Sequence, residues 1–174
     1  MSPETMTGMT VRPQGPLRLV LDTSVYVTAV LSARSDGHCR QLLEAAAADE
    51  ITVIVSPSLL AELRGVLGRD KFRRWIPLSE VDPFVWSVAA IAEQRPDSDV
   101  IPAVDRACQD PGDRYLVALA RSGDAHYLVS TDRDLTEMNH PQVLVRTPTE
   151  IAQMLAQPAE LGSGAAADPR TEEE

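Results

Sequence analysis

The sequence predicts an α/β protein, a three-layer α/β/α sandwich around a central, mainly parallel sheet. Short aliphatic runs of strand type alternate along the chain with longer segments of helical pattern, and that alternation is typical of parallel sheets covered by helices. The strand runs are apolar almost throughout, as expected for strands buried on both faces. With 174 residues, 44% of them hydrophobic and only 4% aromatic, the chain can bury one aliphatic core.

The elements can be assigned in order from their local patterns. The predicted strands are short apolar runs, two of them rich in β-branched residues, at 17–21, 51–55, 126–130 and 143–147. The predicted helices cover 23–33, 39–50, 56–69, 81–94, 113–123 and 147–157. Ser56 is a predicted N-cap with Pro57 at the first helical position, and Thr147 forms a predicted capping box with Glu150. Residues 97–113 are predicted to be an extended run, broken by Pro102, that leads into a turn.

The two ends of the chain differ in composition from its middle. Residues 1–16 are polar, contain Pro and Gly and have no period, so we expect a disordered lead. The Gly-, Ala- and Glu-rich stretch 158–174 is expected to be a flexible acidic tail. A single domain over 17–157 remains between them.

The charge and the thiols narrow the functional classes. The formal net charge is −10, so a nucleic-acid substrate would need a local basic patch, because bulk charge would repel it. Cys39 and Cys108 lie in no CxxC pattern and are expected to be free thiols. No apolar run approaches the ~18 residues of a membrane span and no secretory signal is visible. We therefore expect a cytoplasmic protein without a membrane partner.

Four acidic residues are expected at one edge of the sheet. Asp22 directly follows the first strand, Asp132 follows the strand at 126–130, and Asp113 opens the next helix upstream of that strand. Glu62 lies on the flank of the apolar stripe of the helix 56–69. Because ligands collect at the carboxyl ends of parallel strands, these side chains could converge there. Each residue alone also fits an ordinary role as a cap, a turn residue or a solvated side chain.

Convergence of the four acids would require a cation. Two carboxylates about 4 Å apart repel by about 4 kcal/mol at an effective dielectric constant of about 20. A pocket of carboxylate oxygens favours Mg²⁺ or Mn²⁺. We therefore expect Asp22, Glu62, Asp113 and Asp132 to be the catalytic and metal-binding residues. Asp134 is either a further ligand or a cap of the next turn.

A basic segment is the best sequence candidate for binding nucleic acid. Its cations are interleaved with Phe72 and Trp75, and they are Arg69, Lys71, Arg73 and Arg74. Phosphate contacts and base stacking by such residues are typical of single-strand binding. A solvated helix end explains the same pattern equally well, so both interpretations stay open. Arg114 and Arg133 are weaker candidates.

Three stretches of the chain resemble PIN-domain ribonucleases, especially the VapC-like toxins of bacterial toxin–antitoxin systems. They are "LVLDTSVYVTAVLS", "SPSLLAELRGVL" and "DPGDRYLVALARSGDAHYLVSTDRDL". The resemblance runs from about Leu17 to Leu155 and identifies 17–157 as a PIN-like nuclease domain. It implies that the four acids bind Mg²⁺ or Mn²⁺, that Ser24 helps to hold the first motif, and that Asp134 is an accessory acid. Thr131 stands where the family often has glycine.

The resemblance implies hydrolysis of phosphodiester bonds in single-stranded RNA. It also implies frequent homodimers and inhibition by a cognate antitoxin protein. The alternative is a catalytically silent PIN-like module that binds RNA or a protein. A phospho-accepting receiver domain is disfavoured, because the only lysine, Lys71, is far in sequence from the last strands.

Overall fold

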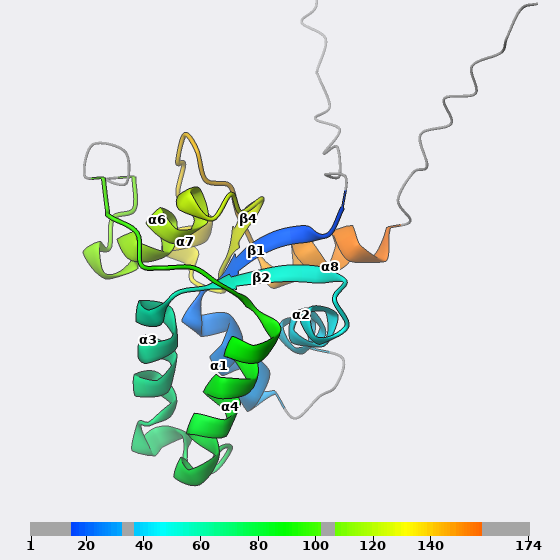
Figure 1. The fold of residues 1–174 in the computed structure, drawn as a ribbon, viewed down its shortest axis with the longest axis vertical. Helices are drawn as coiled ribbons and strands as arrows, with labels where there is room; N and C mark the ends of the chain where they lie inside the picture. Colours follow the sequence, from blue (N-terminus) through cyan, green and yellow to red (C-terminus); the bar gives the residue numbers. More distant parts are fainter. Residues whose placement is uncertain (1–14, 33–36, 102–106, 158–174) are drawn as a thin grey trace, which may run out of the picture.

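The computed structural model describes residues 15–32, 37–101 and 107–157. The expected lead at 1–16, except for its last two residues, and the expected tail at 158–174 lie outside these ranges. The described chain forms a five-stranded, all-parallel sheet with the strand order β3-β2-β1-β4-β5 (Figure 1). The strands are β1 (Leu17–Leu21), β2 (Ile51–Val55), β3 (Glu93–Gln94), β4 (Tyr127–Val129) and β5 (Val145–Arg146). The predicted α/β class is confirmed.

Helices cover both faces of the sheet. They are α1 (Thr23–Leu31), α2 (His38–Ala47), α3 (Pro57–Leu67), α4 (Leu78–Ile91), α6 (Arg114–Ser122), α7 (Arg133–Thr136) and α8 (Pro148–Ala156). The chain adds β2 and β3 on one side of β1, and then β4 and β5 on the other. Right-handed crossovers therefore place α1–α4 on one face and α6 and α7 on the opposite face (Figure 1). Helix α8 packs against α2. The predicted three-layer sandwich is confirmed.

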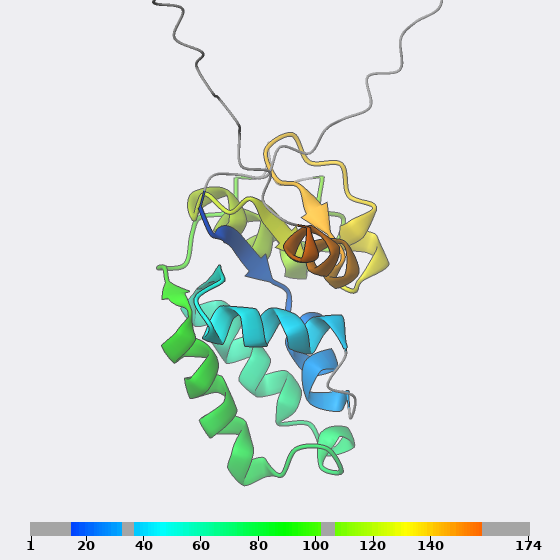
Figure 2. The same cartoon turned by 90° about the vertical axis from the view of Figure 1, so that its right-hand side faces the viewer.

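Helices α3 and α4 form an antiparallel pair that extends away from the sheet (Figure 2). The N-terminus of α3 follows the predicted caps, with Ser56 Oγ accepting a hydrogen bond from the Leu59 amide and Pro57 in the first turn. Helix α8 likewise begins with the predicted capping box of Thr147 and Glu150. These caps fix where α3 leaves the carboxyl edge of β2, and therefore where its residue Glu62 lies relative to the sheet.

The segment 81–94 is predicted to be one helix, but the structure divides it into a helix and a short strand. Helix α4 ends at Ile91, and Glu93–Gln94 forms the edge strand β3 beside Ile54 and Val55. Two residues carry no periodicity from which a strand could be predicted. The guanidinium of Arg18 on β1 donates hydrogen bonds of 2.8 and 3.0 Å to the two Glu93 oxygens. These bonds lower the pKa of Glu93 to about 2 and tie the short edge strand to the middle of the sheet.

The core is aliphatic, as expected from the composition, with Leu19, Ile54 and Leu128 fully buried. Cys39 and Cys108 are buried free thiols, as predicted. Trp86 on α4 is 63% exposed, so its side chain lies outside the core. None of the described helices combines the length and the apolar character needed to cross a membrane.

Gly123, which ends α6, lies too close to the sheet for a larger residue. A Cβ atom there would lie 3.0 Å from the Leu119 carbonyl oxygen and 3.2 Å from two carbons of the Ile54 side chain. Gly123→Ala should therefore lower the free energy of unfolding by about 1–3 kcal/mol through overpacking, measured by urea denaturation. Gly65→Ala is the control, because nothing lies within 4 Å of an added Cβ in the middle of α3. It should stabilise by about 0.5–1 kcal/mol, and equal effects of the two substitutions would contradict the close approach at Gly123.

Candidate active site

The predicted site lies where the sheet changes its direction of growth. Strands β1 and β4 are neighbours, but the chain continues from β1 toward one edge and from β4 toward the other. Such a switch point opens a crevice at the carboxyl ends of the two strands. Asp22 follows β1 and Asp132 follows β4 at this crevice, and the Asp22 amide donates to the Val129 carbonyl at 2.8 Å.

Asp22 is the most buried acid of the site, with 6% exposure. Its Oδ2 atom accepts hydrogen bonds from the hydroxyls of Ser24, at 2.6 Å, and Ser130, at 2.7 Å. The two serines also accept from the loop that carries Asp132, because Ser130 Oγ receives the Asp132 amide and Ser24 Oγ receives the Thr131 amide. The loops after β1 and β4 are thereby joined at the two aspartates.

Ser130 was not predicted as a site residue. A serine after an apolar strand is common turn chemistry, and only the pairing of β4 with β1 brings its hydroxyl to Asp22. Thr131 stands where the family often has glycine, yet it is not among the described residues with positive φ. The β-branched residue therefore causes no left-handed strain in this loop.

Asp113 precedes α6 but does not cap it, since its side chain makes no hydrogen bond to the helix amides. The pKa of Asp113 is raised from 3.8 to about 6, first by burial and then by the negative charges of Asp22, Asp110, Glu62 and Asp132. The carboxylates of the three other predicted residues therefore act on Asp113 across the crevice. Asp110, predicted as a turn residue, does accept the Gly112 amide at 2.7 Å, and it adds a fifth negative charge.

Glu62 and Asp132 are exposed, and hydrogen bonds hold both carboxylates. Glu62 accepts from the phenol of Tyr115 on α6. Asp132 caps α7 by accepting the Asp134 amide at 2.8 Å, so the capping residue is Asp132, while Asp134 lies exposed in the first turn. Among the described residues no three His, Cys, Asp or Glu side chains stand together as metal ligands. Coordination of one ion by these acids would require some of their side chains to move closer together.

The chemistry of the donor set fits a hard divalent cation. The crevice presents carboxylate oxygens from both layers and from two strand ends, and burial together with the negative charge of these acids raises the pKa of Asp113. Oxygen ligands of this kind suit Mg²⁺ or Mn²⁺ better than softer metals, which prefer thiolate or imidazole. Asp22, Glu62, Asp113 and Asp132 are the residues that could hold such an ion.

The basic segment lies far from these acids. Its residues 69–74 follow the end of α3, about 10 Å or more along the helix axis from Glu62, and they lie at the end of the molecule away from the sheet (Figure 1). Arg73 donates to the carbonyls of Leu67, Arg69 and Ile76, which gives this residue a structural role. Lys71 and Arg74 lie over the rings of Phe72 and Trp75 instead.

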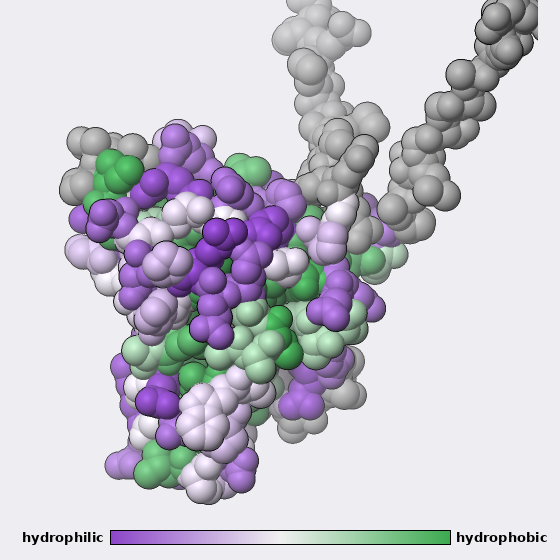
Figure 3. Space-filling view, in the orientation of Figure 1, coloured by the Kyte–Doolittle hydropathy of each residue, from purple (hydrophilic) through white to green (hydrophobic). Residues whose placement is uncertain are grey.

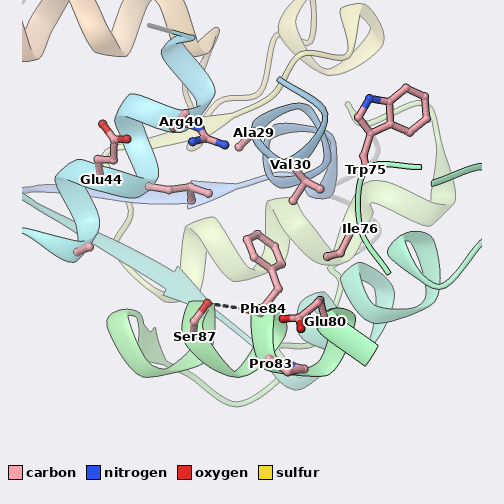
Figure 4. A pocket seen from close by; sticks show the side chains of 12 residues that line it. Ala29, Val30, Arg40, Glu44, Trp75, Ile76, Glu80, Pro83, Phe84 and Ser87 are labelled. Atoms are coloured by element: carbon pink, nitrogen blue, oxygen red, sulfur yellow. Dashed lines mark hydrogen bonds between the residues drawn. The ribbon is translucent and has the colours of Figure 1, made fainter. Parts of the chain in front are cut away.

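An apolar groove of about 620 Å³ lies between α1, α2 and α4, and we call it the α1–α2–α4 groove. Phe84 points from α4 toward Val30 of α1, while Arg40 and Glu44 stand on the α2 side (Figure 4). The surrounding face is apolar over α2 and α4 and more hydrophilic near the sheet (Figure 3). Trp75, with 43% exposure, lies at one end of the groove.

The family of this chain follows from its sequence. Residues 18–134 match the model of the PIN domain, so the chain belongs to the PIN-domain family, and the resemblance noted above is confirmed. The match includes all four acids of the crevice. The sequence has no significant match among curated proteins.

Solved structures with the same fold include two toxin–antitoxin complexes. VapBC2 from Rickettsia felis, bound to a DNA fragment from its promoter, is 17% identical, with a TM-score of 0.54 over 75% of this chain and 98% of that chain. DNA-bound VapBC from Salmonella typhimurium is 14% identical, with a TM-score of 0.51 over 76% and 98%. PAE2754 from Pyrobaculum aerophilum is 16% identical, with a TM-score of 0.55 over 82% and 93%. At these identities the similarity establishes a shared fold.

The raised pKa of Asp113 predicts how the stability of the metal-free protein depends on pH. The folded state binds the Asp113 proton more tightly than the unfolded state, so the ionised carboxylate destabilises the fold increasingly as pH rises from about 4 to about 6. In EDTA, Asp113→Asn should unfold at a temperature roughly 2–4 °C above the parent at pH 7.5. The advantage should shrink at pH 5, as measured by thermal denaturation.

Asp49→Asn is the matched control for this experiment. Asp49 lies after α2 with a φ of 57°, a conformation that asparagine also tolerates, and it is outside the crevice. Its melting temperature relative to the parent should not change between pH 5 and pH 7.5. An Asp113→Asn advantage that is absent, or equal at both pH values, would contradict the crowded carboxylates.

Proposed function

We propose that this chain is a metal-dependent endoribonuclease that cleaves single-stranded RNA in the cytoplasm, as the toxin of a toxin–antitoxin pair. Membership of the PIN-domain family supports a nuclease. The observation that carries the proposal is the placement of Asp22, Glu62, Asp113 and Asp132 at one sheet edge, where burial and then the charges of the other acids raise the pKa of Asp113. A structural role alone gives no reason to gather four acids, none of which forms a salt bridge with another described residue, at the switch point of a parallel sheet.

Asp22, Asp113 and Asp132 are the proposed ligands of Mg²⁺ or Mn²⁺, with Glu62 completing the set or orienting the attacking water. When bound, the cation supplies acidified water and charge neutralisation for the phosphodiester. The chain supplies the orientation. Ser24 and Ser130 fix the carboxylate plane of Asp22 through one oxygen, Oδ2, and Asp134 remains a possible accessory acid.

The RNA strand also needs positive charge from the chain. Lys71 and Arg74, and with them Arg69, remain the proposed phosphate contacts at a distance from the cleaved bond, while Arg73 is engaged by backbone carbonyls. Arg133 is nearer, because it follows Asp132 and its side chain is 85% exposed in a pair with Glu137. We propose that Arg133 contacts the substrate near the crevice and that the basic segment contacts it further along.

RNA cleavage by variants of the crevice tests the proposed function. Asp22→Asn and Asp132→Asn should each lower kcat on a single-stranded RNA at least 10²-fold, because a metal ligand is lost, with Mn²⁺ or Mg²⁺ in a fluorescence-quench assay. Asp49→Asn should cleave like the parent, and EDTA should abolish all activity. Metal-bound parent that binds RNA without cutting it would favour the alternative, a catalytically silent PIN-like module. Cleavage by Asp22→Asn at the parental rate would reject the assigned site.

The proposed protein partner is an antitoxin that occupies the α1–α2–α4 groove. The two VapBC relatives are toxin–antitoxin complexes. The groove combines the apolar side chains of Val30, Leu43 and Phe84 with both signs of charge at its rim, and such a surface suits an amphipathic helix. The exposed indole of Trp86 lies beside residues of α3 and does not line this groove, so it supports a homodimer interface separate from the groove.

A charge placed in the groove should block the antitoxin but not the nuclease. Ala47 is exposed at the end of α2 and lines the groove. Ala47→Glu should therefore weaken co-purification with the co-expressed cognate antitoxin at least tenfold, while RNA cleavage stays at the parental rate. Ala90→Glu, an exposed position of α4 that is not among the lining residues, is the control. Equal co-purification of the two variants would remove the groove from the proposed interface.

A further inference from the structure

A hydrogen bond crosses the crevice between the two helical layers. Tyr115 is the second residue of α6, two positions after Asp113, and its phenol donates to Glu62 Oε2 on α3. The two residues are 53 positions apart in the chain and belong to helices on opposite faces of the sheet. The tyrosine ring is half-buried, whereas Glu62 is exposed. Packing therefore holds the Tyr115 ring in place, whereas the Glu62 side chain would be free to move if this hydrogen bond were absent.

Glu62 needs such an anchor more than the other acids. Asp22 is held by two serine hydroxyls, and Asp132 by the Asp134 amide. Glu62 has a longer side chain, is exposed on a helix flank, and faces carboxylates of the same sign, as its effect on Asp113 indicates. Repulsion and side-chain entropy both favour turning Glu62 outward into water.

We propose that Tyr115 is a positioning residue that holds Glu62 at the acid crevice. This inference rests on the proposed function, in which Glu62 completes the metal site or orients water. The phenol engages one carboxylate oxygen, so the other oxygen can face the crevice. A phenol is uncharged at neutral pH, so Tyr115 acts as a neutral donor that adds no negative charge to the crevice.

A tyrosine suits this position better than the alternatives. Lysine or arginine would pair with Glu62 as a cation and compete with a metal for the carboxylate. Phenylalanine would fill the same space without a donor. Tyr115→Phe therefore removes the hydrogen bond alone and leaves the ring packing of α6 in place, which makes it a clean test of the hydroxyl.

The test is a double-mutant cycle in which the affinity for Mn²⁺ is measured by calorimetry. Tyr115→Phe should weaken Mn²⁺ binding about tenfold, the size usual for a residue that orients a metal ligand. Glu62→Ala should weaken it at least as much, and adding Tyr115→Phe to Glu62→Ala should cause no further loss, because the hydroxyl acts through Glu62. In RNA cleavage at saturating Mn²⁺, Tyr115→Phe should lower kcat and leave KM unchanged.

Tyr127→Phe is the matched control, because it also removes a phenol hydroxyl, but from a residue of β4 whose ring lies under the Arg146 guanidinium. This variant should bind Mn²⁺ like the parent. Parental Mn²⁺ affinity in Tyr115→Phe, or only a lower melting temperature, would overturn the positioning role. The role would also be overturned if Tyr115→Phe lowered the Mn²⁺ affinity equally in the parent and in Glu62→Ala. If the parent binds Mn²⁺ and Asp22→Asn does not, the proposed metal site survives that result. A parent that binds no Mn²⁺ would overturn both proposals together.

Discussion

Negative charges held close together at one sheet edge are the constraint on which the rest of this molecule depends. Asp22 is almost fully buried, and burial, together with the charges of four neighbouring carboxylates, raises the pKa of Asp113 to about 6. A buried carboxylate is tolerated only where hydrogen bonds replace its lost water. Two hydroxyls do so for Asp22, and bonds to a charged group contribute about 1.5–3 kcal/mol each. The aliphatic core offsets the remaining repulsion.

The topology explains why the charges meet there. The chain builds the sheet outward from β1 in two directions, so helices of the two series lie on opposite faces. The crevice at the β1–β4 boundary is consequently the place where a residue of α3, in one layer, can reach a residue of α6, in the other. Two of the side-chain links that cross this boundary are Ser130 to Asp22 and Tyr115 to Glu62. Both join residues that carry or support the acids.

The sequence was sufficient for features that local patterns encode. Apolar runs, caps and the position of Asp22 and Asp132 after their strands gave the layers, four of the five strands and the edge where these two acids lie. It was insufficient where a contact depends on tertiary placement. The two-residue strand β3 has no pattern of its own, and Ser130 and Tyr115 gain their roles only when β4 pairs with β1 and α6 packs opposite α3. Arg73 looked like a phosphate contact because sequence does not reveal the carbonyls that it binds.

The distribution of positive charge links metal binding to RNA binding under the proposed function. Of the arginines next to the acids in sequence, Arg114 donates to the Cys108 carbonyl and Arg133 pairs with Glu137. The basic segment lies at the far end of α3. Without a cation, the negative charge of the acids in the crevice is therefore not balanced by these positive side chains, and the crevice repels a phosphodiester. Each divalent ion bound there removes two negative charges from the approach of the strand, so metal and RNA should bind with positive coupling, in which each raises the affinity for the other.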